Sequence, residues 1–420
     1  MLMPLLLAAY LPLAPMPMAE DKKSAPVPAK KETKKPVKKG MEPHKLANPI
    51  DFDIPAESLT EIACGFASQS EVSHYHVWLP KGYNDPANAK RLYPVMIIDD
   101  AGGNSQNKWK QFEDFVKDTG YICVMPVEVK NGEMKPIIMH YNAILSDLPE
   151  RFRLTPAAGL FTGCSGGSRR AGFISAEFSA YMGGVLHSAA VEINYCKEKH
   201  MFGAAVLGDH DYNIAEMARL VGALGEKRGY YRYFDGGHGW FTKEDGELAL
   251  DWLIHHIGTR AKPMLADDQA KPFILHFKRL AEGSSAPLIT HLNLSRCNEI
   301  LKLHPKLKLD PELSDFAAKL NADILKISQD SAFRKEATAD LAFQKAYFKT
   351  CVEDFANGLP NNGSLQSAAQ KSSVRSVSDK LIKNALKSLE KIAKDFPGTQ
   401  AAAAADQEKA RLAKFPDDWK

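Results

Sequence analysis

The sequence predicts an α/β protein with a mostly parallel sheet flanked by helices, followed by a region made of helices alone. From about residue 60 to residue 260, short apolar runs alternate with segments of helical spacing. Several runs are apolar throughout, as expected of strands that helices cover on both faces. Beyond about residue 265 these runs stop and the chain becomes rich in Ala, Leu and Lys. We therefore expect an α/β domain over residues 49–262 and a helical domain over residues 263–420.

Individual elements follow from the two kinds of pattern. The predicted strands are Val72–Leu79, Tyr93–Asp99, Tyr121–Pro126, Gly159–Gly163, Gly184–Ser188, Phe202–Leu207 and Tyr230–Phe234. The predicted helices between them are Trp109–Lys117, Ile137–Leu148, Arg169–Met182, Ile214–Glu226 and Gly246–Ile257. Such an alternation is the order of a parallel sheet with helical crossovers.

The helical domain is predicted from the segments 288–303, 312–328, 331–356, 376–395 and 401–412. Within the fourth of these, Leu381, Ala385, Leu389 and Ile392 repeat at the spacing of one helical face. The last two helices, divided by Phe396-Pro397-Gly398, resemble one tetratricopeptide-type hairpin. Because such helical surfaces commonly bind peptides or proteins, we expect that these C-terminal helices contact a protein partner.

The N-terminal residues carry a targeting pattern. Residues 1–19 are apolar and uncharged, yet too short and too interrupted by Pro to span a bilayer. They are predicted to be a signal peptide, with an apolar tail as the alternative. Residues 20–48 form a linker rich in Lys, Pro and Ala, which cannot bury enough apolar surface to fold. The chain is therefore expected to be secreted or periplasmic, with no integral membrane segment.

Charge and motif content exclude several classes of protein. The net charge of +3 comes from residues 20–45, which carry nine Lys against four acidic residues, so a nucleic-acid groove is not expected. The six cysteines show no C-x-x-C spacing, and they form either one or two disulfides or buried free thiols. Since metal and nucleotide motifs are missing from the sequence, no cofactor and no metal site are predicted.

A strand-to-helix turn carries a candidate nucleophile. The predicted strand Gly159–Gly163 ends in Cys164-Ser165-Gly166-Gly167, and a helical segment follows. Glycines on both sides of Ser165 allow the tight turn that exposes a serine hydroxyl at the end of a strand. Cys164 is a weaker candidate, because it should point away from the pocket.

Acid and base candidates follow two later strands. Asp209 and Asp211 come after Phe202–Leu207, and His238 comes after Tyr230–Phe234. The carboxyl ends of parallel strands meet at one edge of a sheet, so these side chains are expected near Ser165. In this constellation His238 would deprotonate Ser165 and an aspartate would orient the imidazole. The structural alternative is that Asp211 caps a helix or forms an Asx turn.

Residues 70–260 resemble the α/β-hydrolase superfamily, in particular its esterase and polyhydroxybutyrate-depolymerase-like branch, which includes feruloyl and acetyl-xylan esterases. The order Ser, Asp, His and the turn around Ser165 carry the resemblance. The G-x-x-D pattern at 208–211 then implies Asp211 rather than Asp209 as the acid. The resemblance also implies an oxyanion hole from the amides of Gly166 and of Gly102 (or Ala101). Asp99-Asp100 stands where relatives carry a His, and a carboxylate there would oppose an oxyanion unless it points away.

These features predict a serine esterase that cleaves carboxylic esters through an acyl-enzyme. The alternatives are a peptidase of the prolyl-oligopeptidase type and a degenerate hydrolase scaffold whose C-terminal helices bind a protein. The loop 189–201 is too short for a large lid, so an open cleft for short acyl esters, free or linked to a polysaccharide, is expected. Trp109, Tyr212 and Trp240 are the predicted substrate-binding residues.

Overall fold

The computed structural model describes residues 54–65, 72–103, 105–211, 213–260, 262, 264–353 and 368–418. The predicted signal peptide and the Lys-rich linker lie outside these residues, and so does Tyr212.

The described residues form an eight-stranded sheet in the order β1-β2-β4-β3-β5-β6-β7-β8. The strands are β1 (Leu59–Gly65), β2 (Val72–Trp78), β3 (Val95–Asp100), β4 (Ile122–Pro126), β5 (Gly159–Cys164), β6 (Met182–Ser188), β7 (Phe202–Gly208) and β8 (Gly229–Phe234). The pairs β1–β2 and β2–β4 are antiparallel, and all other neighbours are parallel. This arrangement is an α/β-hydrolase fold, and the predicted fold class is confirmed.

Helices cover both faces of the sheet. They are α1 (Trp109–Thr119), α2 (Met134–Arg151), α3 (Gly166–Glu177), α4 (Met217–Arg228) and α5 (Lys243–Gly258). Apolar residues of α2, α3 and α4 pack in one core cluster, and those of α1 and α5 pack in the other. Because the strands lie between the two clusters, their side chains are buried on both sides, which explains their continuous apolar runs.

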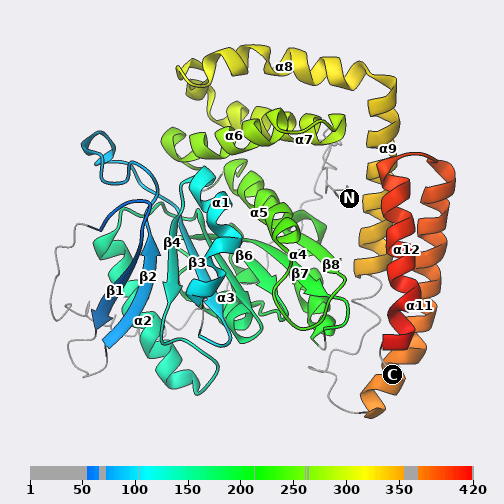
Figure 1. Cartoon of the computed structure of the whole chain (residues 1–420), viewed down its shortest axis with the longest axis horizontal. Coiled ribbons are helices and arrows are strands. Elements are labelled where there is room, and N and C mark those ends of the chain that lie inside the picture. The colour runs from blue at the N-terminus through cyan, green and yellow to red at the C-terminus, as the bar shows by residue number, and fades with distance from the viewer. Residues whose placement is uncertain are drawn as a thin grey trace, which may run out of the picture.

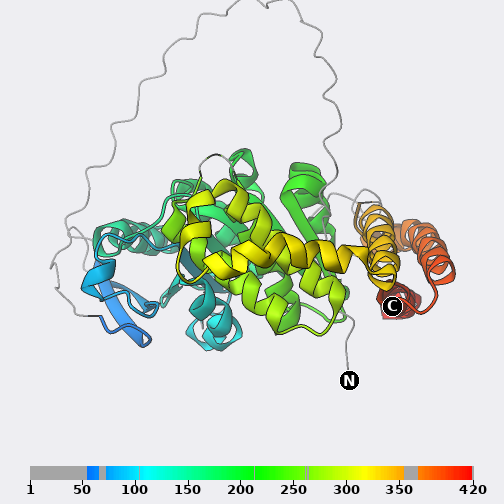
Figure 2. The same ribbon diagram turned by 90° about the horizontal axis from the view of Figure 1, so that it is seen from above.

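A second set of helices follows the sheet. It consists of α6 (Asp267–Glu282), α7 (Pro287–Leu303), α8 (Ser314–Gln329), α9 (Ser331–Ala346), the π-helix η6 (Tyr347–Glu353), α11 (Ala368–Asp395) and α12 (Gln400–Asp418). The helices α6 and α7 pair and extend the core of α1 and α5, while α8 runs across them toward α9 (Figure 2).

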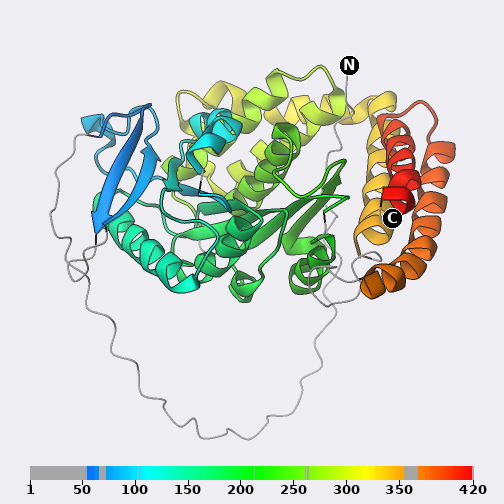
Figure 3. The same ribbon diagram turned by 60° about the horizontal axis from the view of Figure 1, so that its bottom comes forward.

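The last helices stand beside the β8 end of the sheet. Figures 1 and 3 show α9, α11 and α12 side by side at that end, opposite β1 and β2. The amide of Tyr233 in β8 donates to the hydroxyl of Tyr347 in η6 at 3.1 Å. This contact satisfies a donor of the edge strand, which otherwise would be open to pairing with another chain.

Two elements were not predicted, and their sequences explain why. The strand β1 mixes polar with apolar residues and forms an edge hairpin with β2. The helix α6 contains Pro272, which normally ends a helical pattern. In addition, the helix predicted to reach Met182 ends at Glu177, because Met182 already belongs to the buried strand β6.

The cysteines are free thiols, one of the two readings left open by the sequence. All six lie among the described residues, and all are buried and unpaired with one another. They behave as small apolar core residues.

Candidate active site

Ser165 lies in a strained turn between β5 and α3. Its backbone has φ 55° and ψ −118°, a conformation that non-glycine residues rarely adopt. A residue held in such a conformation points to a functional role, because the surrounding structure must stabilise the strain. The hydroxyl of Ser165 does not cap α3, although the serine stands at the N-terminus of that helix. It is therefore available for another partner.

The flanking glycines allow this turn to form. A Cβ atom on Gly163 would lie 2.4 Å from the carbonyl carbon of Gly167, and one on Gly167 would lie 2.4 Å from the backbone oxygen of Asp99. Both distances are too short for any side chain. The glycines predicted from the motif are thus required by the close approach of three backbone segments.

The structure brings Ser165, His238 and Asp211 together. The Nε2 atom of His238 lies 2.8 Å from the Oγ of Ser165, and its Nδ1 lies 3.0 Å from Oδ1 of Asp211. The three side chains come from loops after β5, β8 and β7, at the carboxyl edge of the parallel strands. This geometry can move a proton from the serine to an imidazole that a carboxylate orients.

Asp211 is fully buried. Its Oδ1 accepts a hydrogen bond from the amide of Asn213 at 2.8 Å, which is the Asx turn expected if Asp211 had a structural role. The same oxygen also faces His238, so this carboxylate both forms the Asx turn and contacts the imidazole. Burial raises the pKa of Asp211, while the bonds from His238 and Asn213 oppose that rise.

Asp209 has different partners. Its Oδ1 accepts from the amide of Gly236 at 3.2 Å, and its Oδ2 accepts from Nη1 of Arg411 at 2.8 Å. The hydrogen bond to His238 is made by Asp211, as the G-x-x-D pattern implies. Arg411 belongs to α12, and no local signal around Asp209 could have indicated it.

The two acidic residues that end β3 have different partners. Asp99 is fully buried and receives a bidentate ion pair from Arg170, at 2.7 and 3.0 Å, and a hydrogen bond from Tyr141 at 2.5 Å. Asp100 accepts from the indole of Trp240 at 2.6 Å and from the amide of Gly102. No local pattern could indicate a partner for Asp99, because Arg170 lies 71 residues away in the sequence.

The amides expected in the oxyanion hole have distinct environments. Gly166 is the first residue of α3, next to Ser165, so its amide lies at a helix N-terminus. The amide of Gly102 donates to Oδ1 of Asp100 at 2.8 Å and is engaged within its own turn. Ala101, the alternative donor, is anchored because its carbonyl accepts from the amide of Asn131 at 2.8 Å.

Asn131 also reaches the turn of Ser165, a role that the sequence did not suggest. A Cβ atom on Gly166 would lie only 1.8 Å from its Oδ1, and that oxygen accepts from Nη1 of Arg170 at 3.1 Å. Arg170 thereby links the end of β3 and the loop after β4 to α3. The signal that could have found it is the Asn-Gly pair in an exposed loop after a buried strand.

The two described residues that were predicted to bind substrate, Trp109 and Trp240, have different environments. Trp240 is half-buried, packs against Phe112 and is held by Asp100 beside the loop that follows β3. Trp109 is a core residue instead, 8% exposed, with its ring 5.3 Å from that of Trp78. Burial in the core cluster makes Trp109 a packing residue, and its assignment to a cleft is not supported by its position.

Other reactive groups near Ser165 are inert. Burial raises the pKa of Cys164 to about 12, so its thiol is not a nucleophile at neutral pH. Burial lowers the pKa of His187 to about 3, so this imidazole stays neutral. It forms a hydrogen bond with the hydroxyl of Ser168 at 2.8 Å and so joins β6 to α3.

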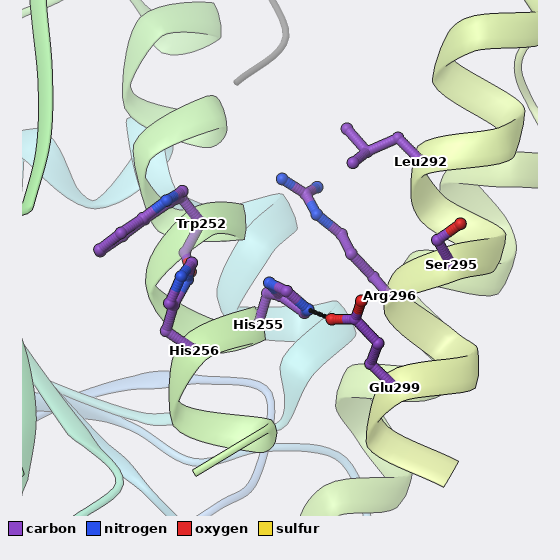
Figure 4. Close-up of a pocket in the computed structure, with 7 residues that line it drawn as sticks. All are labelled: Trp252, His255, His256, Leu292, Ser295, Arg296 and Glu299. Atoms are coloured by element: carbon purple, nitrogen blue, oxygen red, sulfur yellow. Dashed lines mark hydrogen bonds and ion pairs between the residues drawn. The ribbon is translucent and has the colours of Figure 1, made fainter. Parts of the chain in front are cut away.

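A separate small pocket lies between α5 and α7 (Figure 4). It is lined by Trp252, His255, His256, Leu292, Ser295, Arg296 and Glu299. His255 pairs with Glu299 at 2.8 Å, and the ring of His256 stacks on Trp252. The pocket shares no lining residue with the Ser165 group, and its polar side chains join the two helices.

The likeness of this chain to known proteins lies in distantly similar solved structures. No protein-family model and no curated protein matches the chain. The chain is similar to the solved structure of a ferulic acid esterase, with 15% identity, 46% of this chain and 95% of that chain covered, and a TM-score of 0.38. It is also similar to an S-formylglutathione hydrolase from Staphylococcus aureus, with 11% identity, 47% and 98% coverage, and a TM-score of 0.38. A third similar structure is a mutant of the feruloyl esterase module from Clostridium thermocellum complexed with sinapinate, at 12% identity, 51% and 94% coverage and a TM-score of 0.38. At such identities we draw function from the geometry of the Ser165 group.

Proposed function

We propose that the chain is a serine esterase that cleaves carboxylic esters through an acyl-enzyme. The observation that supports this most strongly is the hydrogen-bonded series Ser165–His238–Asp211 on a strained strand-to-helix turn. Ser165 attacks the ester carbonyl as its proton passes to Nε2 of His238. His238 then protonates the departing alcohol. In the second half of the reaction His238 takes a proton from water, the water attacks the acyl-enzyme, and His238 returns the proton to Ser165 as the acid leaves.

The developing oxyanion would be stabilised by the amides of Gly166 and Ala101, because the amide of Gly102 is bonded to Asp100. The helix N-terminus of α3 favours negative charge at this point. Arg170 neutralises the carboxylate of Asp99, and the carboxylate of Asp100 accepts hydrogen bonds from the indole of Trp240 and the amide of Gly102. The ion pair with Arg170 thus removes one of the two negative charges by which the sequence departs from the family pattern.

The substrate we propose is a short acyl ester, free or linked to a polysaccharide, with Trp240 at the site. The chain is proposed to act outside the cytoplasm, on the pattern of residues 1–19. Within the part of the chain that the structure describes, no helix is long and apolar enough to cross a membrane.

Turnover of p-nitrophenyl acetate, beside matched peptide p-nitroanilides, tests the reaction type. Ester turnover without peptide cleavage is the expected result, whereas peptide cleavage without ester turnover would favour the prolyl-oligopeptidase-type alternative. An acyl-chain-length series, with acetylated xylan and feruloyl esters, tests the substrate. A strong preference for long acyl chains would contradict the open cleft.

A further inference from the structure

Asp209 joins the two loops that carry the proposed acid and base. Its amide donates to the carbonyl of Phe234 at 3.0 Å, and its Oδ1 accepts from the amide of Gly236 at 3.2 Å. Gly236 lies two residues before His238, and Asp209 lies two residues before Asp211. A shift of this carboxylate would therefore move both loops.

The second oxygen of Asp209 is held by the C-terminal helix. Nη1 of Arg411 in α12 lies 2.8 Å from Oδ2, across 202 residues of sequence. The side chains of Asp209 and Arg411 are only 2% and 13% exposed. The guanidinium also donates to Glu408 at 2.9 Å and lies 5.8 Å from the ring centre of Tyr233. Nearly the whole ion pair is thus removed from solvent.

The helix α12 is itself fixed in the core. Its Ala405 and Leu412 are fully or almost fully buried, and they belong to the same cluster as α9 and α11. Figure 1 shows this helix on the β8 side of the sheet, where the loop with His238 begins. Arg411 is therefore a rigid contact between a packed helix and the loop of Asp209.

We propose that Arg411 is a positioning residue of the Ser165 site, acting through Asp209. The inference deepens the proposed function and rests on it. Without Arg411 the buried Asp209 keeps, among the described residues, only His210 as a nearby basic group, with its Nδ1 at 3.6 Å from Oδ1, and a turn of the carboxylate toward His210 or water would draw it away from Gly236. With the ion pair in place, Oδ1 remains available for the loop of His238. The C-terminal helical region thereby becomes part of the scaffold that holds the acid and the base at hydrogen-bonding distance.

The test compares Arg411→Gln, Arg411→Lys and the control Leu412→Ala in the full chain. Leu412 is the adjacent core residue of α12, so its truncation loosens the helix without removing a partner of Asp209. We expect Arg411→Gln to lower kcat for p-nitrophenyl acetate about 10- to 100-fold with little change in KM. Arg411→Lys retains most of kcat, because the contact to Asp209 is a single hydrogen bond. Leu412→Ala lowers the thermal midpoint but keeps kcat well below that midpoint. The double variant Arg411→Gln with Asp209→Asn is no slower than the slower single variant.

A second readout does not require turnover. The ring-nitrogen chemical shifts of His238, assigned in 15N-histidine-labelled protein with His238→Ala, report its hydrogen bonds to Asp211 and Ser165. These shifts should change in Arg411→Gln and remain at the wild-type values in Leu412→Ala. Wild-type shifts and kcat in Arg411→Gln, or equal effects of Leu412→Ala, would overturn the inference. If the wild-type chain hydrolyses no ester but the shifts respond as expected, the proposed function fails while the positioning role stands.

Discussion

Nδ1 of His238 lies 3.0 Å from Asp211, and the neighbouring carboxylate of Asp209 is bonded to Arg411. Two aspartates separated by a single residue thus have different tasks. One faces the imidazole next to Ser165, and the other ties the loop to the C-terminal helix.

Replacing the two aspartates separates these tasks. Asp211→Asn should lower kcat about 10³- to 10⁴-fold, because the imidazole loses both its orienting acceptor and the charge that stabilises the imidazolium. Asp209→Asn keeps the acceptor of His238 and should be clearly milder. Steady-state kinetics with p-nitrophenyl acetate measures both. The reverse order of severity would identify Asp209 as the acid.

Removing the cation beside Asp99 should destabilise the fold. Arg170→Ala leaves a fully buried carboxylate with only Tyr141 as a side-chain partner, at an expected cost of about 3–5 kcal/mol in the free energy of unfolding. Urea unfolding measures this cost. Adding Asp99→Asn should recover part of it, since the buried charge is then gone. A loss below about 1 kcal/mol, typical of an exposed pair, would contradict a buried one.

Stability should depend on pH through Asp340 in α9. Burial raises the pKa of this carboxyl to about 7, and its Oδ2 has no hydrogen-bond partner among the described residues. The folded-state pKa lies above the unfolded value of about 3.9, so stability is fully present below that value and is lost as pH rises through 7. Asp340→Asn should therefore stabilise the protein at pH 8, by on the order of 3–4 kcal/mol at most, and have little effect at pH 4.

Unfolding of the wild type and Asp340→Asn at both pH values measures this difference. An equal effect at pH 4 and pH 8 would show that Asp340 does not titrate in this range. Asp330→Asn offers a matched control, because Asp330 caps the same helix through its side chain but has no comparable burial.

Local patterns predicted most of the fold. Apolar runs placed buried strands such as β3, β4 and β7, which helices cover on both faces, and the alternating strand β2 was placed as well. The turn at Ser165 was predictable because its glycines are required by backbone contacts. The edge strand β1 and the proline-containing helix α6 were not, because their local patterns conflict with the elements that tertiary packing imposes on them.

Long-range partners were beyond sequence reasoning. The order of Ser165, Asp211 and His238 follows from strand order, so their meeting could be expected. The pairing of Asp99 with Arg170 and of Asp209 with Arg411 spans 71 and 202 residues, with no periodic signal between them. The environment of Trp109 also depends on a residue that is distant in the sequence. This aromatic residue near a loop was assigned to a cleft, although it packs on Trp78.

The central claim is that Ser165 is an activated nucleophile. A fluorophosphonate probe forms a covalent adduct with such a serine, and peptide mapping by mass spectrometry locates it. We expect one adduct on Ser165 in the wild type, none in Ser165→Ala, and strongly slowed labelling in His238→Ala. Labelling at another residue, or unchanged labelling in Ser165→Ala, would contradict the proposed site.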